Sequence, residues 1–551
     1  MFKGHPKGLP VLFFTEMWER FGFYLMLGIF SLYMLDPSEP GPFGGMGFSR
    51  EWAAEVYGTY LALVYLTPFF GGIIADRFLG YRKSVYLGGT LMALGYLGLA
   101  VPGVGIFYIS LLLIVLGNGF FKPNISTLVG RLYPEGSKLK DSGYNIFYMG
   151  INIGAFVCNF VAAILRNNFG WGYAFAAAGI GMLIGLVTFF LGQKHLTMVH
   201  DRGEVGSVAD TGILGKLVFQ IIIPAGICGF IGYEFFGGLF GGSPQTAAFI
   251  FATIPVIGYY VVLVLTSPKE ERAPIGALLS IFAVVIVFWM IFHQNGSSLT
   301  YWAEENTKRE AGVLAPVLRF FSFDQDATIG TTIKDPDAPG SYWRNVPPEQ
   351  RPPAGKTVTL ISTELFQSIN PFFVVFLTPL VVGFFGWLRR RNKEPSTPAK
   401  IAWGMVITAV STLFMIAAVH VTHGGQFKAS PWWLVGTYGV ITVGELFLSP
   451  MGLALVSKLS PKRVTALMMG GWFLATAIGN KLSGVLAGLW EKIPLEGIFW
   501  INFASALGAA LVIAALTPWI RRVMAEHEQA TADRIAAEAE ATASAEASSS
   551  E

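Results

Sequence analysis

The chain has 551 residues, of which 53% are apolar and only 13% are charged, and its mean hydropathy is +0.55. Because an ordinary soluble domain carries about 25% charged residues, this composition excludes a soluble enzyme and predicts an all-α protein that crosses the membrane many times. The net charge of +3 gives no reason to expect a nucleic-acid partner, and the only two cysteines lie in apolar segments, so no disulfide framework is expected.

A helix needs about 20 residues to cross the hydrocarbon core of a bilayer. Fourteen apolar segments meet this requirement, at roughly 10–35, 52–75, 83–102, 105–129, 142–165, 171–191, 214–236, 245–266, 275–300, 361–388, 400–421, 432–457, 465–489 and 497–519. The segments between them are short except 301–360, which is rich in Pro, Asp and Arg. The tail 523–551 is rich in Ala, Glu and Ser, and we expect it to be disordered or marginally helical.

The Lys and Arg residues predict the orientation of these spans. When the N-terminus is placed in the cytoplasm, most of the 38 Lys and Arg residues fall in cytoplasmic segments, as expected for an inner-membrane protein whose termini are both cytoplasmic. An unpaired charge inside a span costs at least ~2.5 kcal/mol, so charged residues within spans are candidates for function. The basic ones are Arg20, Lys122 and Lys481, and the acidic ones are Glu16, Glu19, Glu234, Glu364 and Glu445.

The first span carries three charges in the stretch TEMWERFGFY, residues 15–24. Glu16, Glu19 and Arg20 follow the spacing i, i+3 and i+4, so they share one face of the helix. A charged cap at the cytoplasmic end of the helix is the structural alternative. Two carboxylates beside one guanidinium suit a proton site better, because one can pair with Arg20 while the other gains and loses a proton.

The fourth and fifth spans add further polar groups. Lys122 lies deep in the fourth span, too far from its ends for a snorkelling lysine, and we expect it to face the same cavity as Arg20. In the fifth span, Tyr148 and Asn152 share a face, where ordinary helix packing is as good an interpretation as ligand binding.

The second half of the chain carries one isolated carboxylate, Glu445, with Ser449 one turn further on. A lone buried carboxylate needs a cation or a proton. Asn370 precedes a proline, and His293 lies near the outer end of its span, where a packing role and a proton relay are both open. No phosphate-binding loop, metal-ligand set or nucleophile motif is found, so we expect no ATP-driven transport, no cofactor and no enzymatic activity.

Seven sequence blocks follow one another along the chain: EMWERFGFY, GGIIADRFLGYRKS, GNGFFKPNIS, FYMGINIGA, FQSINP, GELFLSP and MMGGWFLATAIGN. In this order they resemble the proton-dependent oligopeptide transporter family of the major facilitator superfamily. The resemblance implies the major facilitator fold, with an N-terminal six-helix bundle (1–195), an inserted helix pair (213–267) and a C-terminal six-helix bundle (273–522). It further implies a proton-coupled importer of di- and tripeptides that works by alternating access, and we expect a monomer in the lipid bilayer.

The same resemblance implies roles for individual residues. Glu16 and Glu19 would couple protons through Arg20, while Arg20 and Lys122 would face the peptide carboxylate and Glu445 the peptide amine. The implied pocket contacts are Tyr24, Asn152, Asn370, Ser449, the wall residue Trp472, and either Tyr60 or Tyr65.

Two positions depart from the family pattern. Phe23 replaces a tyrosine of the first block, and Leu27 and Gln294 stand where many members place an ion pair that gates the outer side. We therefore expect that pair to be absent, and His293 beside it to sense pH. The alternatives are an importer of another anion such as nitrate, which Glu445 disfavours, and an intramembrane enzyme or receptor.

Overall fold

The computed structural model describes residues 2–134, 139–196, 215, 218–239, 243–328, 341–343, 346, 347, 349, 351, 353, 355–461 and 464–549. Within these ranges, the side chains at 76, 77, 140, 141, 341, 449–451, 453, 454, 457, 458, 465, 466 and 531–549 are not described. Ser449 is among them, so its predicted role in the pocket lies outside the described side chains.

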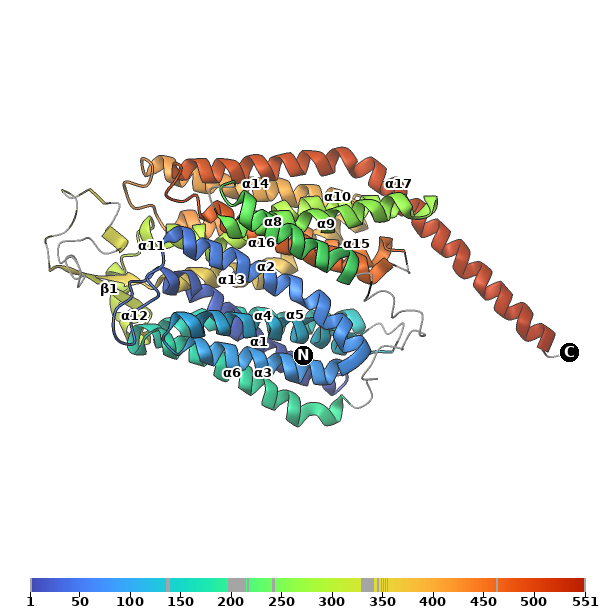
Figure 1. Cartoon of the computed structure of the whole chain (residues 1–551), viewed down its shortest axis with the longest axis horizontal. Helices are drawn as coiled ribbons and strands as arrows, with labels where there is room; N and C mark the ends of the chain where they lie inside the picture. Colours follow the sequence, from blue (N-terminus) through green and yellow to red (C-terminus); the bar gives the residue numbers. More distant parts are fainter. Residues whose placement is uncertain are drawn as a thin grey trace.

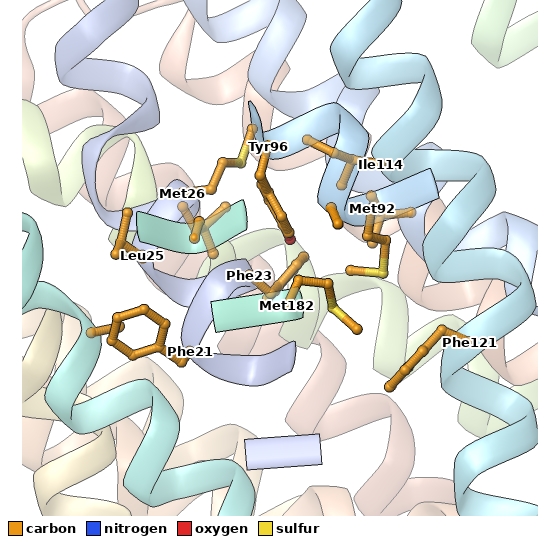
Figure 2. Close-up of a cluster of buried hydrophobic side chains, with 14 of the residues drawn as sticks. Phe21, Phe23, Leu25, Met26, Met92, Tyr96, Ile114, Phe121 and Met182 are labelled. Atoms are coloured by element: carbon orange, nitrogen blue, oxygen red, sulfur yellow. The ribbon is translucent and has the colours of Figure 1, made fainter. Parts of the chain in front are cut away.

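The first half of the chain forms one bundle of long helices (Figure 1). Its members are α1 (Gly8–Leu35), α2 (Arg50–Ile74), α3 (Tyr81–Leu99), α4 (Val104–Arg131), α5 (Lys140–Phe169) and α6 (Trp171–Gly192). α1 contacts α5 and α6, while α4 contacts α2 and α3. A single cluster of buried apolar side chains fills this bundle, and Figure 2 shows Phe23 and Tyr96 in it among several methionines. Small residues allow the helices to approach closely, since a Cβ on Gly154 of α5 would lie 2.3 Å from the Met17 carbonyl oxygen of α1.

The second half forms a second bundle with its own apolar cluster. Its members are α10 (Lys269–Phe292), α13 (Ile369–Arg390), α14 (Thr397–Val421), α15 (Trp432–Leu459), α16 (Thr465–Ala487) and α17 (Leu495–Ser549). The two bundles meet where α2 contacts α16 and α5 contacts α13. Between the bundles in sequence, a short π-helix (Val218–Ile222) leads into α8 (Ile223–Phe236), which contacts α9 (Pro244–Thr266).

The long segment between α10 and α13 covers one end of both bundles, which we call the strand end (Figure 1). It contains α11 (Ser298–Glu305), α12 (Ala315–Phe321) and two antiparallel strands, β1 (Asp324–Thr328) and β2 (Thr357–Ile361). Asp324 pairs with Ile361 and Thr328 with Thr357. The opposite end, from which α17 projects, is called the tail end (Figure 1).

Each of the fourteen expected spans overlaps one long helix of the structure. In the described part of the chain, ten helices are long and apolar enough to cross a membrane. The other four are α1, which carries Glu16, Glu19 and Arg20, and α3, α15 and α16, whose bounds are given by their described residues. The chain is therefore a multi-pass membrane protein with the expected two-bundle, all-helical architecture.

For the tail, which we expected to be disordered or marginally helical, the described backbone from 523 to 549 is helical. The backbone of α17 continues as a helix as far as Ser549 and projects beyond the bundles (Figure 1). Ala and Glu have high helix propensity, so this composition favours a helix.

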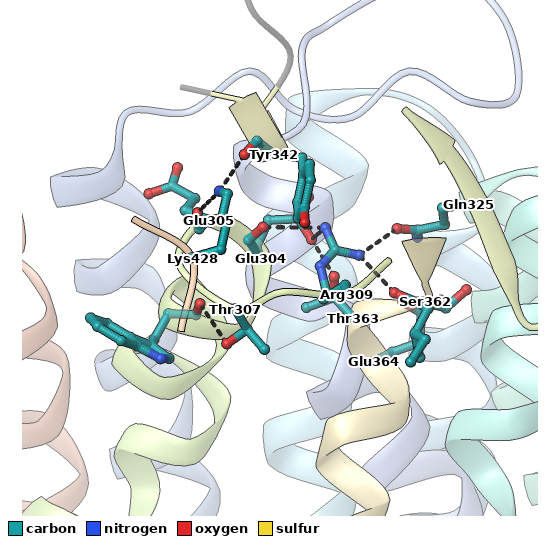
Figure 3. Close-up of polar contacts among 12 residues, drawn as sticks. Glu304, Glu305, Thr307, Arg309, Gln325, Tyr342, Ser362, Thr363, Glu364 and Lys428 are labelled. Atoms are coloured by element: carbon teal, nitrogen blue, oxygen red, sulfur yellow. Dashed lines mark hydrogen bonds and ion pairs between the residues drawn. The ribbon is translucent and has the colours of Figure 1, made fainter. Parts of the chain in front are cut away.

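Lys428, in the loop between α14 and α15, anchors the strand-end segment. Figure 3 shows its ammonium group donating to the backbone oxygens of Glu305 and Tyr342, and Nζ lies 4.3 Å from the centre of the Tyr342 ring. Burial, with a further contribution from Arg309, lowers the pKa of Lys428 to about 7. The folded protein thus binds the Lys428 proton more weakly than the unfolded protein does.

This shift predicts a pH dependence of stability. Because the unfolded chain holds the Lys428 proton more tightly, the folded state is penalised below pH 7, and the penalty falls as the pH rises toward 10.5. The free energy of unfolding should gain about 1 kcal/mol from this group between pH 6 and pH 8. Thermal unfolding in detergent at both pH values measures this, and Lys428→Met should have a flatter profile. An identical slope in wild type and variant would contradict the assignment.

Candidate functional site

The three charges of TEMWERFGFY lie together on α1, inside the first bundle. Two guanidinium nitrogens of Arg20 bond the Glu19 carboxylate, with Nη2 2.6 Å from Oε1 and Nε on Oε2. Glu16 is held more loosely, with Oε1 3.4 Å from Arg20 Nε. Its Oε2 is buried and has no hydrogen-bond partner among the described residues. Glu19 is therefore the structural partner of Arg20, and Glu16 is the carboxylate with an uncommitted oxygen.

The second predicted cation, Lys122 of α4, belongs to the same group of charges. It interacts electrostatically with Arg20, Glu19 and Glu16. Its ammonium lies 4.2 Å from the centre of the Tyr65 ring, close enough for a cation–π contact. Within the described part of the chain no ion pair is found for Lys122. Its charge therefore remains available to an anionic ligand.

The structure separates the two candidate tyrosines of α2. Tyr65 contacts Lys122, and its ring centre also lies 5.7 Å from that of His293 in the second bundle. Tyr60 is buried against Phe30, inside the first bundle. Of the two, Tyr65 is consequently the one that contacts both Lys122 and a residue of the second bundle.

His293 lies just after α10, in a short 3-10 turn (His293–Gly296), and it is buried. Its ring stacks on Trp289 at 5.0 Å, and Nδ1 has no hydrogen-bond partner among the described residues. The geometry thus combines a packing contact with one unsatisfied nitrogen.

Glu445 of α15 is the acidic counterpart in the second bundle. Oε2 accepts a hydrogen bond of 3.2 Å from Asn370 of α13, which also donates to Thr442 at 2.9 Å. No cation pairs with Glu445 in the described ranges. Tyr24 of α1 and Tyr65 of α2 both belong to the first bundle, and Tyr65 is the one that contacts the cation Lys122.

The remaining predicted contacts lie in different surroundings. Tyr148 of α5 interacts with Glu445 and Tyr65. Asn152, one turn away, donates its amide to the Tyr148 carbonyl oxygen at 2.9 Å, so the structure gives it a helix-internal bond. Trp472 is buried within the second bundle, and its ring centre lies 6.3 Å from that of Phe282.

The strand end is closed by ion pairs that the sequence did not predict. Leu27 is buried, and Gln294 donates to Asn502 of its own bundle at 2.8 Å. Elsewhere at this end, Arg166 Nη1 of α5 lies 3.0 Å from Glu364 Oε2, and Arg50 pairs with Glu305. These contacts join the first bundle to the segment between α10 and α13 that covers the strand end.

The third basic residue found inside a span, Lys481 of α16, also joins the bundles. Its ammonium pairs with Glu55 of α2 and lies 2.9 Å from Thr59 Oγ1. Its presence inside an apolar span was the only sequence signal for this contact. Among the described residues, no group of three or more His, Cys, Asp or Glu could hold a metal ion.

Comparisons with known proteins agree with this architecture. A family model described as the POT family matches residues 82–221 and 355–501. The uncharacterized transporter YclF of Bacillus subtilis (strain 168) is 31% identical over 95% of this chain and 96% of its own length. The di-/tripeptide transporter of Lactococcus lactis subsp. cremoris is 29% identical over 95% of this chain and 98% of its own length.

Solved structures of POT transporters have a similar fold. The crystal structure of a peptide transporter POT in complex with sulfate has a TM-score of 0.76 at 30% identity, covering 95% of this chain and 97% of the other. A POT family transporter in complex with a thioalcohol-conjugated peptide has a TM-score of 0.73 at 27% identity, covering 94% and 98%.

Proposed function

This chain belongs to the POT family, and from that membership we propose that it imports di- and tripeptides together with protons. The proposal places the protein in the cytoplasmic membrane, with both termini in the cytoplasm and the strand end outside. The bundles 1–195 and 273–522 would rock against each other, with the pair 213–267 inserted between them, and the protein would work as a monomer.

The observation that carries the proposal is the pair of opposite charges on the two bundles. Arg20 and Lys122 lie in the first bundle, and Glu445 lies in the second without a cationic partner among the described residues. A short peptide is a zwitterion whatever its side chains. Its carboxylate can bind the cations and its amine Glu445, so the site would recognise the backbone rather than the sequence. A small inorganic anion would not need Glu445.

The proton would be carried by the carboxylates of α1. Arg20 is bound by Glu19 and approached by Glu16, so an incoming peptide carboxylate competes with both for the same guanidinium. When the peptide carboxylate binds Arg20, the Glu16 or Glu19 carboxylate that loses this partner is stabilised by taking up a proton. Binding of peptide and proton is then reciprocally coupled. A net positive charge entering a negative interior gains ~2.3 kcal/mol per 100 mV.

We assign the pocket contacts from the same geometry. Tyr65 is assigned through its contact with Lys122 and Tyr24 through the resemblance, and Asn370 would orient Glu445 through its 3.2 Å hydrogen bond. Asn152, Ser449 and Trp472 remain assigned by resemblance alone. We assign Tyr60 to packing because it lies against Phe30.

His293 is proposed as a pH-sensing group from its place beside the missing ion pair, and its ring lies 5.7 Å from that of Tyr65. In His293→Gln, the pH dependence of uptake should shift. A pH profile unchanged from wild type would contradict this role.

The test is uptake of a labelled dipeptide into proteoliposomes under an imposed pH gradient. Dialanine should accumulate above its external concentration when the outside is acidic, and accumulation should disappear when an ionophore collapses the gradient. Absence of uptake for any dialanine-like substrate would refute the proposed function.

A further inference from the structure

The carboxylate of Glu55 on α2 is bound by groups from two separate helices. Oε1 is bonded by the Lys481 ammonium of α16, and Oε2 accepts a hydrogen bond of 2.8 Å from the Thr246 hydroxyl of α9. Glu55, Lys481 and Thr246 are all buried. One carboxylate of the first bundle is therefore shared between the second bundle and the inserted helix pair.

The inserted pair is attached to the second bundle. Only Ser267 and Pro268 separate the end of α9 from the start of α10. Near that end, Tyr260 is buried in the apolar cluster of the second bundle and donates a 2.8 Å hydrogen bond to the Leu467 carbonyl oxygen. The connection to the first bundle is longer, running from Gly192 to Val218. α9 is thus expected to move with the second bundle.

The helices that carry Glu55 and Lys481 touch through their backbones. A Cβ on Gly58 of α2 would lie 2.9 Å from the Gly484 Cα of α16, and one on Gly484 would lie 2.6 Å from the Ala54 carbonyl oxygen. Contact this close leaves no room for water or a side chain between the helices. Separating the bundles here must break the bonds of Glu55 to both Lys481 and Thr246.

We propose that Glu55 is a latch that holds the strand end closed through two contacts, and that the inserted pair takes part in the transport cycle through Thr246. The inference rests on the proposed function, since it requires the strand end to open during transport. Loss of the Thr246 hydroxyl removes one of the two contacts and should favour the open strand end. The shift should be about two- to tenfold in the ratio of open to closed protein, the range for one hydrogen bond.

The test measures spin-label distances at the strand end of the full chain. Cys158 and Cys228 are first replaced by Ala, and labels are attached to cysteines at the exposed positions Val104 of the first bundle and Trp432 of the second. Thr246→Val should raise the long-distance population. Thr246→Ser, which keeps the hydroxyl, should match the parent protein. In a Glu55→Met background, Thr246→Val should have no further effect.

With labels at Gln193 and Arg391, on the tail end, Thr246→Val should instead lower the long-distance population. Identical strand-end distance distributions in Thr246→Val and the parent would overturn the latch. A shift in Thr246→Ser as large as that in Thr246→Val would also overturn it, because it would indicate a packing effect and not loss of the hydroxyl. If the parent protein showed a single strand-end distance that dialanine did not change, the strand end would not open. That result would overturn both the proposed function and the latch.

Discussion

Replacing Glu16 by Gln should abolish proton-driven accumulation of dipeptide while sparing counterflow exchange. Glu16 has one buried oxygen without a partner among the described residues, and its other oxygen is 3.4 Å from Arg20. Gln resembles the protonated carboxyl in shape and charge, so the variant should cycle with peptide but transport no proton. Internal dipeptide should then only reach the external concentration, even with an acidic exterior.

Glu19→Gln is the matched comparison, with the same chemical change one helical turn away. Glu19 holds Arg20 by two hydrogen bonds, so its loss should misplace the guanidinium and impair both accumulation and exchange. Both variants are measured in proteoliposomes loaded with unlabelled dipeptide, with and without a pH gradient. Accumulation by Glu16→Gln at the wild-type level would show that Glu16 does not carry the proton.

Replacing Glu445 by Gln should raise the Kd for dialanine about 10- to 100-fold. The change removes the negative charge that faces the peptide amine, and a hydrogen bond to a charged group contributes about 1.5–3 kcal/mol. Calorimetric titration of purified protein measures this change.

N-acetyl-dialanine provides the control for this variant, since it lacks the amine. Wild type and Glu445→Gln should bind the acetylated peptide equally weakly. A parallel loss for both peptides would instead indicate that Glu445 supports the fold of α15 or the position of Asn370.

The sequence alone singles out the charged groups of the proposed site because charge is expensive in a membrane. Glu16, Glu19 and Arg20 share a helix face through their spacing alone, and the structure brings them together. Lys122 joins them from another helix. By contrast, Tyr60 and Tyr65 could not be ranked, since the choice depends on the rotation of α2 against neighbouring helices, which sequence spacing does not fix.

Contacts between distant segments were not predictable from local patterns. Arg50 and Glu305 are 255 positions apart, and Arg166 and Glu364 are 198 apart. Lys481 was recognisable as a charge inside an apolar span. Its partner Glu55 was not, because it lies near the start of α2 together with other charged residues. The paired strands of the 301–360 segment were also missed, because β1 has the sequence DQDAT, without an apolar alternation.

The most direct test of the central claim follows protons and peptide in the same vesicles. Proteoliposomes containing a trapped pH-sensitive dye are given dialanine at equal internal and external pH, with the interior held negative by a potassium diffusion potential. The interior should acidify on addition of dialanine, and Glu16→Gln should eliminate this response. Dialanine entry without acidification of the interior would contradict proton-coupled import.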